Sequence, residues 1–477
     1  MLLRLTSIVL LFSLSLSLLA AENNQLPDIG SPSSAGITPA NEKQLGASLL
    51  RWLRQNHLIS NDPIIQSYIH SLGYQLVANS DESRQPYIFF VVNDPSINAF
   101  AAPGGYIGIH TGLILTTETE DELAGVMAHE IAHITQRHMA RTYQSAKRHQ
   151  LATAVALLAA VLIGQNVDQL TEAALVTATA ANAQLQINFT RSNEKEADYI
   201  GIKTLANAGF NPSGMPAFFE RMQKATRLYS ERELPEFLRT HPVTVNRIAD
   251  SRSRARTMHY KPHSQQSVYA YIKARVQVQK IDDIKQFIHE YKNDQHVKKD
   301  SSVYNYTLAI AHLKADQAPE AQSYIKKLIR KNPESLIFRI AQAQIQQKLG
   351  QTKKAFNNYN AMLRLYPYSH VVTLYFSEHL LATNKASTAY RVLREYTRNR
   401  TPDNLILKRM SQAANALGKT GEAYLYLAET EYLNGNTHTA INHLATALKN
   451  THNDYYLTSK IEARISEYKK MALKEKK

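Results

Sequence analysis

An interval of 34 residues recurs through the C-terminal half of this 477-residue chain. It separates four alanines and two prolines, which are Ala321, Ala355, Ala389 and Ala423, and Pro333 and Pro367. A hairpin of two α-helices needs a small side chain where the helices approach closely, and proline stands where a helix cannot continue. Accidental spacing is the alternative, but chance rarely keeps six such residues in phase. The interval therefore predicts a stack of helical hairpins with a continuous core between neighbours.

Three further landmarks match one known repeat. The tetratricopeptide (TPR) repeat has glycine, a small residue and proline at fixed places, and these places are filled by Gly350, Ala355 and Pro367. The phase breaks later, since Gly435 and Ala440 repeat the glycine-to-alanine spacing half a repeat out of step. We expect a TPR-like helical repeat domain over residues 266–477, in which residues 266–299 form a helical pair joined to the preceding part.

The preceding part mixes helices and strands. Residues 41–79 carry apolar side chains at helical spacing. Three segments rich in β-branched and aromatic residues predict strands, at 87–92, 97–102 and 106–110. Turn residues separate them, so we expect a small antiparallel sheet. A long helix follows, where Thr119 and Glu122 have the spacing of a capping box. The predicted fold is mainly α, with an α+β domain that contains a small β-sheet, followed by an α-helical TPR solenoid.

The first residues have the pattern of an export signal. Arg4 supplies a positive start, residues 5–19 are apolar apart from a few serines and a threonine, and Ala20 and Ala21 offer small side chains for cleavage. A membrane anchor is the alternative, but the run is short for a span of about 20 residues. We expect a cleaved signal peptide over residues 1–21. The chain has no cysteine, so an exported form has no disulfide, no thiol nucleophile and no cysteine-linked lipid. These features suggest a bacterial periplasmic protein.

The strongest chemical signal is the sequence HEIAH at residues 129–133. Because an α-helix has about 3.6 residues per turn, His129 and His133 lie on one side of the helix and can bind the same ion. Glu130 projects near them without occupying a ligand position, where it can take a proton from water on the metal. The motif also arises by chance, but here it lies on a capped helix after a sheet. Without cysteine, the predicted metal is one zinc ion held by histidine and carboxylate.

Zinc in a catalytic site needs a third protein ligand and an open position for water. The metzincin pattern HExxHxxGxxH is excluded, because Gln136 and Met139 stand at its glycine and last histidine positions. His138 follows His133 by five residues, and on a continuous helix it would point away from that histidine. We therefore expect His138 to lie on the surface.

A downstream helix offers better candidates for the third ligand. Glu194 and Asp198 are four residues apart and so share one helix face. We expect Glu194 to bind the metal while Asp198 hydrogen-bonds a ligand histidine. Glu196 points elsewhere on the same helix.

Four segments together resemble the BepA-type periplasmic metallopeptidases, members of the gluzincin family that includes HtpX and the CAAX-processing membrane proteases. They are HEIAH, EKEAD at residues 194–198, NAFAAPGG at 98–105 and THPVTVNR at 240–247. The similarity covers nearly the whole chain, including the repeats. It implies a zinc metalloprotease domain over residues 22–265 in a periplasmic endopeptidase at the outer membrane. Such an enzyme would degrade misfolded or stalled outer-membrane proteins and assist their assembly.

The resemblance also implies roles for individual residues. It makes His129, His133 and Glu194 the zinc ligands, Glu130 the general base and Asp198 the carboxylate behind a ligand. It makes residues 98–101 an edge strand that pairs with the backbone of an extended substrate. The residues of that strand are Asn98, Ala99, Phe100 and Ala101.

Two residues after the predicted sheet and helices complete the candidate site. Arg247 has a fixed charge that suits a carboxylate or a developing oxyanion. His241 could donate a hydrogen bond to the tetrahedral intermediate, or it could bind zinc in place of water and keep the enzyme inactive. The alternative is a histidine that caps a helix and a surface arginine.

Apolar and basic segments suggest partners. Residues 151–190 contain a 14-residue apolar run, too short to cross a bilayer, which predicts a buried helix or a lid that touches the membrane. From Ser302 onward the chain contains 26 lysines and arginines and 13 acidic residues, whereas the rest contains 29 lysines and arginines and 27 acidic residues. An exported protein meets little nucleic acid, so a membrane surface or an acidic protein is the expected partner, and a merely solvated face is the alternative.

The sequence leaves a second function open. The repeats would act as a chaperone or adaptor of the outer-membrane assembly machinery, with a largely silent or autoinhibited protease site. The intact Glu130 counts against it, because a structural metal site has no use for a base.

Overall fold

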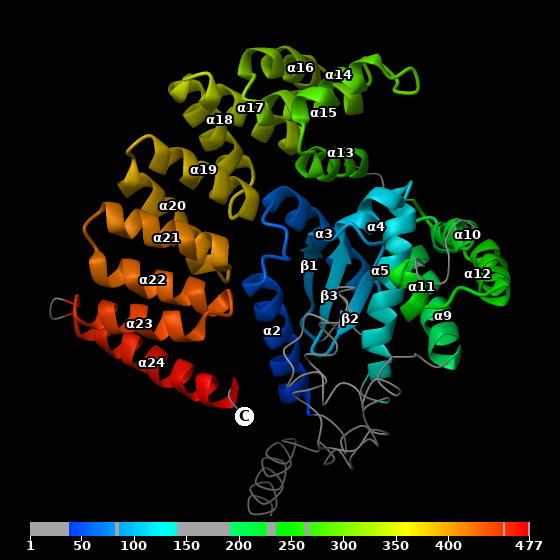
Figure 1. The fold of residues 1–477 in the computed structure, drawn as a ribbon, viewed down its shortest axis with the longest axis horizontal. Coiled ribbons are helices and arrows are strands. Elements are labelled where there is room, and N and C mark those ends of the chain that lie inside the picture. The colour runs from blue at the N-terminus through cyan, green and yellow to red at the C-terminus, as the bar shows by residue number, and fades with distance from the viewer. Residues whose placement is uncertain are drawn as a thin grey trace, which may run out of the picture.

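The structure is a computed structural model that describes residues 38–81, 85–139, 141, 191–226, 235–262, 268–451 and 454–475. Figure 1 shows a sheet flanked by helices, and an arc of helices that passes along one side of it. We call residues 38–262 the N-terminal part and residues 268–475 the repeat part. The predicted signal peptide and the apolar segment over residues 151–190 lie outside the described residues.

Three strands form one mixed sheet in the order β1-β3-β2. Strand β1 (Ile88–Val92) runs parallel to β3 (Tyr106–His110), and β2 (Ala99–Ala102) runs antiparallel to β3. The expectation of an antiparallel sheet is therefore wrong for β1 and β3. The tight turn after β2 returns the chain between the two earlier strands. Gly104 and Gly105 in this turn have φ angles of 77° and 86°, which glycine adopts without steric cost.

Both faces of the sheet are covered. Phe89 and Val91 of β1 belong to the core that the sheet shares with helices α3 (Pro63–Val77) and α5 (Glu120–Thr135). Phe90 and Val92 point to the opposite face and pack against leucines of α2 (Pro39–Gln55). A strand buried on both faces has no need of polar residues at alternate positions, which explains the continuous apolar run.

Eight described helices complete the N-terminal part. They are α2 (Pro39–Gln55), α3 (Pro63–Val77), α4 (Thr111–Thr116), α5 (Glu120–Thr135), α9 (Arg191–Asn207), α10 (Gly214–Thr226), α11 (Glu236–Thr240) and α12 (Val245–Thr257). The predicted cap of α5 is confirmed, because the Thr119 hydroxyl accepts from the Glu122 N–H. The Glu122 carboxylate returns to the Glu118 N–H at 2.8 Å, one residue earlier than in a standard capping box.

The repeat part consists of helical hairpins, as the 34-residue interval predicts. A joining pair comes first, and the remaining helices follow in order. They are α13 (Tyr269–Lys280), α14 (Ile284–Asn293), α15 (Ser302–Lys314), α16 (Ala318–Lys331), α17 (Leu336–Lys348), α18 (Thr352–Leu365), α19 (His370–Ala382), α20 (Ala386–Asn399), α21 (Asn404–Ala416), α22 (Thr420–Leu433), α23 (Thr437–Leu448) and α24 (Tyr455–Glu475).

The recurring alanines lie on the second helices of four hairpins. Ala321, Ala355 and Ala389 are fully buried, and Ala423 is nearly so. Ala440 is fully buried on α23, where the phase changes, and α22 packs against both α21 and α23. The TPR solenoid expected from the sequence is therefore present.

The repeat part contacts the N-terminal part at its beginning through α13, in its middle, where α19 packs against α3, and at its end through α22. Arg275 of α13 donates from Nε to Asp62, which caps α3, at 2.7 Å, and donates to the Tyr375 hydroxyl of α19 at 3.0 Å. At the far end, Arg54 of α2 donates to the Leu433 carbonyl at 3.3 Å. The arc is thus fixed against α2 and α3 along much of its length.

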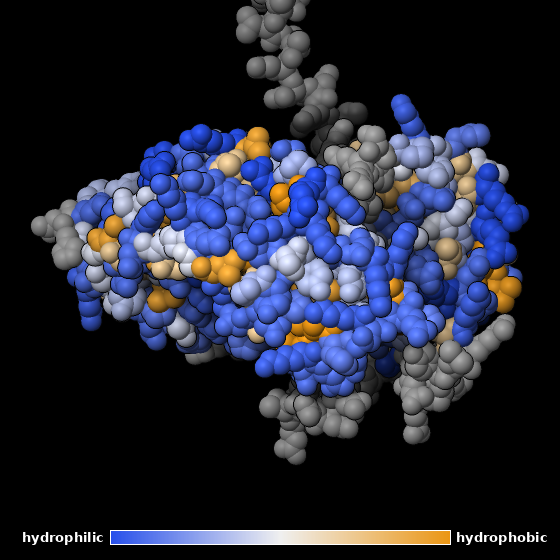
Figure 2. All heavy atoms as spheres, turned by 90° about the horizontal axis from the view of Figure 1, so that it is seen from above, coloured by the Kyte–Doolittle hydropathy of each residue, from blue (hydrophilic) through white to orange (hydrophobic). Residues whose placement is uncertain are grey.

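Three of the second helices of the repeat part are rich in basic residues. Helices α16, α18 and α20 carry ten lysines and arginines and two acidic residues, and all ten cations are exposed. We call these ten side chains the basic face. In the view of Figure 2 the surface is largely hydrophilic, with small, scattered hydrophobic spots. Among the described helices, none has the length and apolar character that a membrane span requires.

Candidate metal centre and active site

Helix α5 supplies His129, Glu130 and His133, all of which are buried. The Nε2 atoms of the two histidines are 3.0 Å apart. Helix α9 approaches α5 closely, because Gly201 of α9 faces the backbone of α5. A Cβ at Gly201 would lie 3.1 Å from the backbone nitrogen of His129. This close packing brings in Glu194, whose carboxylate oxygens lie 3.4 Å from His133 Nε2 and 3.5 Å from His129 Nε2.

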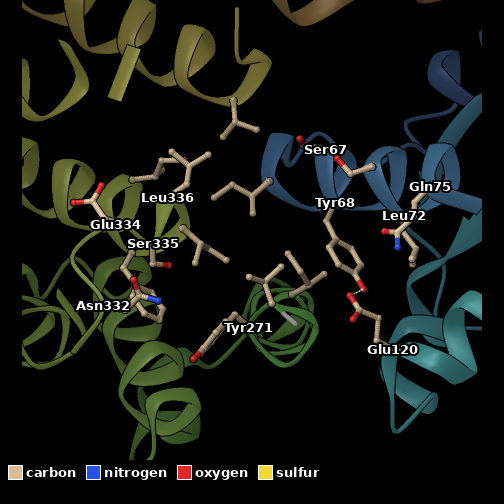
Figure 3. Close-up of a pocket in the computed structure, with 18 residues that line it drawn as sticks. Ser67, Tyr68, Leu72, Gln75, Glu120, Tyr271, Asn332, Glu334, Ser335 and Leu336 are labelled. Atoms are coloured by element: carbon tan, nitrogen blue, oxygen red, sulfur yellow. Dashed lines mark hydrogen bonds between the residues drawn. The ribbon is translucent and has the colours of Figure 1, made fainter. Parts of the chain in front are cut away.

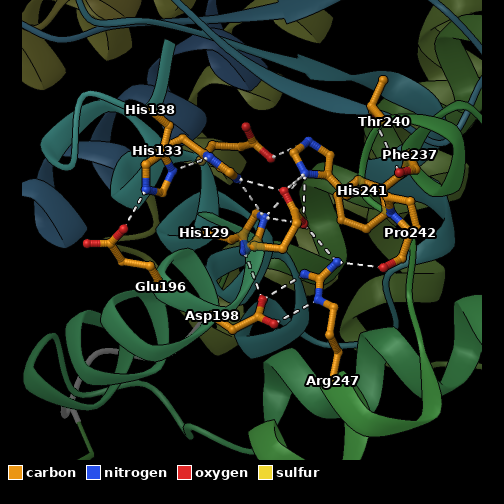
Figure 4. Close-up of polar contacts among 12 residues, drawn as sticks. His129, His133, His138, Glu196, Asp198, Phe237, Thr240, His241, Pro242 and Arg247 are labelled. Atoms are coloured by element: carbon orange, nitrogen blue, oxygen red, sulfur yellow. Dashed lines mark hydrogen bonds and ion pairs between the residues drawn. The ribbon is translucent and has the colours of Figure 1, made fainter. Parts of the chain in front are cut away.

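His241 closes the group from the opposite side. It ends α11, where its N–H donates to the Phe237 carbonyl at 2.7 Å. Its Nδ1 lies 3.0 Å from Glu194 Oε1 and 3.4 Å from His129 Nε2. One donor atom from each of His129, His133, Glu194 and His241 lies within 4.8 Å of the others. The side chains converge from three elements (Figure 4).

Arg247 joins two carboxylates behind this group. Its Nε and Nη2 each lie 2.8 Å from an oxygen of Asp198, and its Nη1 lies 2.8 Å from Glu194 Oε2. Asp198 Oδ1 also lies 3.1 Å from His129 Nδ1. Thr244 caps α12 and accepts the Arg247 N–H at 3.2 Å, which sets the direction of the arginine. Since Arg247 is only 4 % exposed, the alternative of a surface arginine is wrong.

The charges of the group follow from its burial and its pairs. Burial opposes charge on His129, but Asp198 and Glu194 outweigh it and raise the pKa of that imidazole to about 9. Burial and the neighbouring charge on His129 push the pKa of His133 well below its ordinary value. Burial alone would raise the pKa of Glu194, but His241 and His129 hold it well below the usual range.

The ion pair of Glu130 is longer than those that Arg247 makes with Glu194 and Asp198. The Glu130 carboxylate is fully buried, and neither oxygen has a hydrogen-bond partner among the described residues. Its ion-pair partner is His241, whose Nε2 lies 3.6 Å from Glu130 Oε1. Burial raises the pKa of Glu130. A buried carboxylate whose oxygens accept no hydrogen bond costs free energy, and such groups concentrate at functional sites.

The predicted substrate strand lies beside α5. Ala99, Phe100 and Ala101 belong to β2, the edge strand, which pairs only with β3 among the described strands. Asn98, just before β2, is fully buried, and its amide has no hydrogen-bond partner in the described part of the chain. A small cavity of about 40 Å³ between β2 and the end of α5 is lined by Ala101 and His133, among others.

A larger cavity lies elsewhere. It has a volume of about 440 Å³ and lies between α3, α13 and the start of α17, with Tyr68, Tyr271 and Leu336 in its lining (Figure 3). Tyr68 donates to Glu120 at 2.8 Å. None of the residues of the candidate site lines this cavity.

His138 is fully buried, and the expectation of a surface histidine is wrong. Helix α5 ends at Thr135, and Arg137 takes a left-handed conformation with φ of 51°, so the chain turns back. His138 Nδ1 therefore lies 2.7 Å from His133 Nδ1, and its Nε2 lies 3.1 Å from Glu196 Oε2. The expectation assumed a helix that continued, and no glycine or proline marks its end. Sequence reasoning missed both His138 and Glu196.

The buried group fits a zinc ion chemically. Two imidazoles and one carboxylate match the three protein ligands of many catalytic zinc sites. The donor atoms are buried and mutually within 4.8 Å, and Asp198 orients one of the histidines.

Comparison with known proteins agrees with this chemistry. Residues 63–255 match the model of peptidase family M48. The putative beta-barrel assembly-enhancing protease of Vibrio cholerae is 34 % identical over 423 residues, which cover 87 % of this chain and 86 % of that protein. The chain belongs to peptidase family M48. As a member it is a metalloprotease, and the resemblance drawn from its sequence motifs is confirmed.

Two other relatives show how far the similarity extends. The beta-barrel assembly-enhancing protease of Escherichia coli (strain K12) is 32 % identical and covers 94 % of this chain and 91 % of its own length. The mitochondrial metalloendopeptidase OMA1 of Schizosaccharomyces pombe is 32 % identical over 181 residues, which cover 38 % of this chain and 50 % of that protein.

Proposed function

We propose that this protein is a periplasmic zinc metalloendopeptidase that degrades misfolded or stalled outer-membrane proteins and assists their assembly. The observation that carries the proposal is the buried group of His129, His133 and Glu194 next to the buried carboxylate of Glu130, whose oxygens accept no hydrogen bond from the described residues. A structural zinc site has no use for that carboxylate, whereas peptide hydrolysis needs a base. Bacterial relatives named as beta-barrel assembly-enhancing proteases support the substrate class.

Each residue of the group has a task. His129, His133 and Glu194 would hold one zinc ion. When bound, zinc supplies a Lewis acid that polarises a peptide carbonyl and makes water more acidic. Glu130 takes the proton of the attacking water and then passes it to the leaving amine. The raised pKa of Glu130 favours both transfers, because a base closer to the working pH accepts and returns a proton readily.

Asp198 and Arg247 act by positioning. Asp198 fixes the ring of His129 through Nδ1, and so directs Nε2 toward the metal. Arg247 holds Asp198 and Glu194 in one arrangement and balances their charge. This assignment replaces the oxyanion role considered for Arg247, since its nitrogens are engaged by these two carboxylates.

The edge of β2 would receive the substrate. An extended peptide that adds to this edge forms backbone hydrogen bonds, and these are independent of side-chain identity. The unpaired amide of Asn98 lies at the start of the edge and offers a further donor and acceptor. The enzyme would therefore select unfolded segments more than particular sequences.

His241 gives the site a second state. Its Nδ1 lies among the donor atoms of the group, so the imidazole would fill the fourth ligand place and exclude water. Movement of the loop after α11 would then open the site. In the open state His241 Nε2 could donate to the tetrahedral intermediate.

A second function is favoured by this closed arrangement. A site with four protein ligands and no open place resembles a structural zinc site. In that case the chain serves mainly as an adaptor, and its repeats bind the outer-membrane assembly machinery. In either function, the basic face would bind an anionic membrane surface peripherally, and an acidic protein is the competing partner.

Zinc content and cleavage of casein by the full chain and by Glu130→Gln test the proposal. We expect about one zinc per chain in both proteins and cleavage by the wild type alone. A wild type that holds zinc but cleaves neither casein nor an unfolded outer-membrane protein would favour the adaptor. The His241→Ala variant then separates a closed enzyme from a silent one.

A further inference from the structure

We propose that His138 and Glu196 form a relay that fixes the tautomer of His133, and that both are positioning residues for the metal. The inference rests on the proposed function, because it concerns one of the proposed zinc ligands. It assigns a task to two side chains that the mechanism above leaves unused.

The two ring nitrogens of His133 face different groups. Nε2 lies 3.0 Å from His129 Nε2 and 3.4 Å from Glu194 Oε1, so it faces the other proposed ligands. Nδ1 lies 2.7 Å from His138 Nδ1. At this distance the two Nδ1 atoms share one hydrogen, and the metal can bind only if His133 carries it. With that hydrogen on Nδ1, the lone pair of His133 is on Nε2.

Glu196 decides which histidine carries the hydrogen. An ionised carboxylate only accepts, so His138 Nε2, which lies 3.1 Å from Glu196 Oε2, must be the protonated nitrogen of His138. A neutral imidazole has a single N–H, so His138 Nδ1 is an acceptor. The shared hydrogen then belongs to His133 Nδ1. Arg141, whose Nη2 lies 3.2 Å from the same carboxylate oxygen, favours the ionised form of Glu196.

The turn after α5 makes this relay possible. Because Arg137 reverses the chain, His138 reaches back onto His133 and is fully buried there. The other ligand histidine, His129, meets its carboxylate directly at Asp198. The two zinc ligands from α5 are therefore fixed in different ways, one by a buried carboxylate and the other by an imidazole that ends on a carboxylate 36 % exposed to solvent.

Zinc affinity of the zinc-free full chain, measured by competition with a chelator, tests the relay. We expect His138→Phe, which keeps a ring but removes both nitrogens, to weaken zinc binding by about 10-fold to 100-fold. His138→Asn should recover most of the loss, because its carbonyl oxygen can accept the His133 Nδ1–H. Glu196→Ala, at the half-exposed end, should fold normally and show a smaller loss than His138→Phe. The matched control is His312→Phe, which removes a buried histidine of α15 far from the metal site and should leave zinc affinity unchanged.

Equal zinc affinity of wild type and His138→Phe would overturn the relay and leave the proposed function intact. Failure of His138→Asn to recover any zinc affinity would also overturn the relay. A purely steric role of His138 would not make the smaller asparagine bind zinc better than phenylalanine does. A second readout needs no metal. Nitrogen-15 spectra of the zinc-free protein, with the His133 signal assigned from His133→Gln, should show His133 protonated at Nδ1. A His133 protonated at Nε2 would contradict the relay, whether or not the wild type binds zinc. Absence of zinc binding by the wild type would instead contradict the proposed function.

Discussion

Arg247 holds Asp198 by two parallel hydrogen bonds, with Nε and Nη2 each 2.8 Å from one carboxylate oxygen. The same guanidinium reaches Glu194 at 2.8 Å, so one buried cation serves two buried carboxylates. A fork of this kind fixes direction as well as charge, which a lysine cannot reproduce. The proposed ligand from α9 therefore depends on α12 for its placement.

Removal of this cation should destabilise the zinc-free protein. Arg247→Met leaves Glu194 and Asp198 buried without their arginine, and we expect the free energy of unfolding to fall by about 3–5 kcal/mol. Urea unfolding of the zinc-free chain measures the change. Arg252→Met is the control, because Arg252 lies on the same helix and pairs with Glu220 at the surface, a contact worth about 0–1 kcal/mol. Equal losses in the two variants would contradict the buried role.

His241 should restrain the enzyme. If its imidazole occupies the fourth ligand place, His241→Ala keeps zinc on three ligands and raises basal casein cleavage severalfold, because water gains access. Steady-state cleavage and zinc content of the same sample measure this. His259→Ala, at an exposed histidine, controls for loss of a histidine as such. Unchanged or lower cleavage in His241→Ala would contradict a resting state closed by this residue.

Zinc uptake should release a proton. The pKa of His129 is raised to about 9, so at pH 7 the zinc-free protein carries a proton on that ring which zinc must displace. The raised pKa means that the proton is lost only as pH rises toward 9. Apparent zinc affinity should therefore increase with pH from 6 to 8, by up to about tenfold per pH unit. Calorimetry in two buffers of different ionisation enthalpy counts the protons. Zinc affinity that is independent of pH between about 6 and 8 would contradict the displacement of a proton from His129.

The basic face should bind anionic lipid. Arg330, Arg364 and Arg398 are separated by 34 residues and occupy the last turns of α16, α18 and α20. Changing all three to glutamine should weaken binding to phosphatidylglycerol vesicles roughly a hundredfold, because each cation near an anionic surface contributes about 1 kcal/mol. Vesicle sedimentation measures the partition.

The matched control carries the same loss of charge elsewhere. Changing Arg252, Arg254 and Arg256 of α12 to glutamine removes three exposed cations outside the repeat part. Equal losses would indicate a general charge effect, and no vesicle binding by the wild type would favour an acidic protein as the partner.

The predictable parts of this molecule are those fixed by local periodicity. The 34-residue interval placed the alanines of the hairpins correctly, because close helix packing admits only small residues at those positions. The helix that carries HEIAH followed from its cap at Thr119 and its apolar spacing. The parallel pairing of β1 and β3 could not be read in the same way, because strand direction depends on which neighbour the chain returns to.

The position of His138 shows the same limit at the site. Spacing along an ideal helix predicted its direction, but the end of α5 at Thr135 and the left-handed Arg137 reversed it. The sequence has no glycine or proline that marks where that helix ends. The sequence allowed only the hypothesis that His241 joins the group. Its position next to Glu194 depends on how the segment after α11 packs in three dimensions.

The contacts of α13, α19 and α22 with the N-terminal part have a consequence for partner binding. A solenoid anchored at one end presents its inner surface to any ligand in solution. In this protein the N-terminal part already lies against the repeat part and acts as a ligand within the same chain. Tethering gives such a ligand a local concentration of the order of millimolar or more. A second protein that sought the same surface would have to outcompete this concentration, and three separate contacts would have to release together. Weak partners are therefore directed to the outer surface, and only a partner that binds tightly or at several points can open the arc.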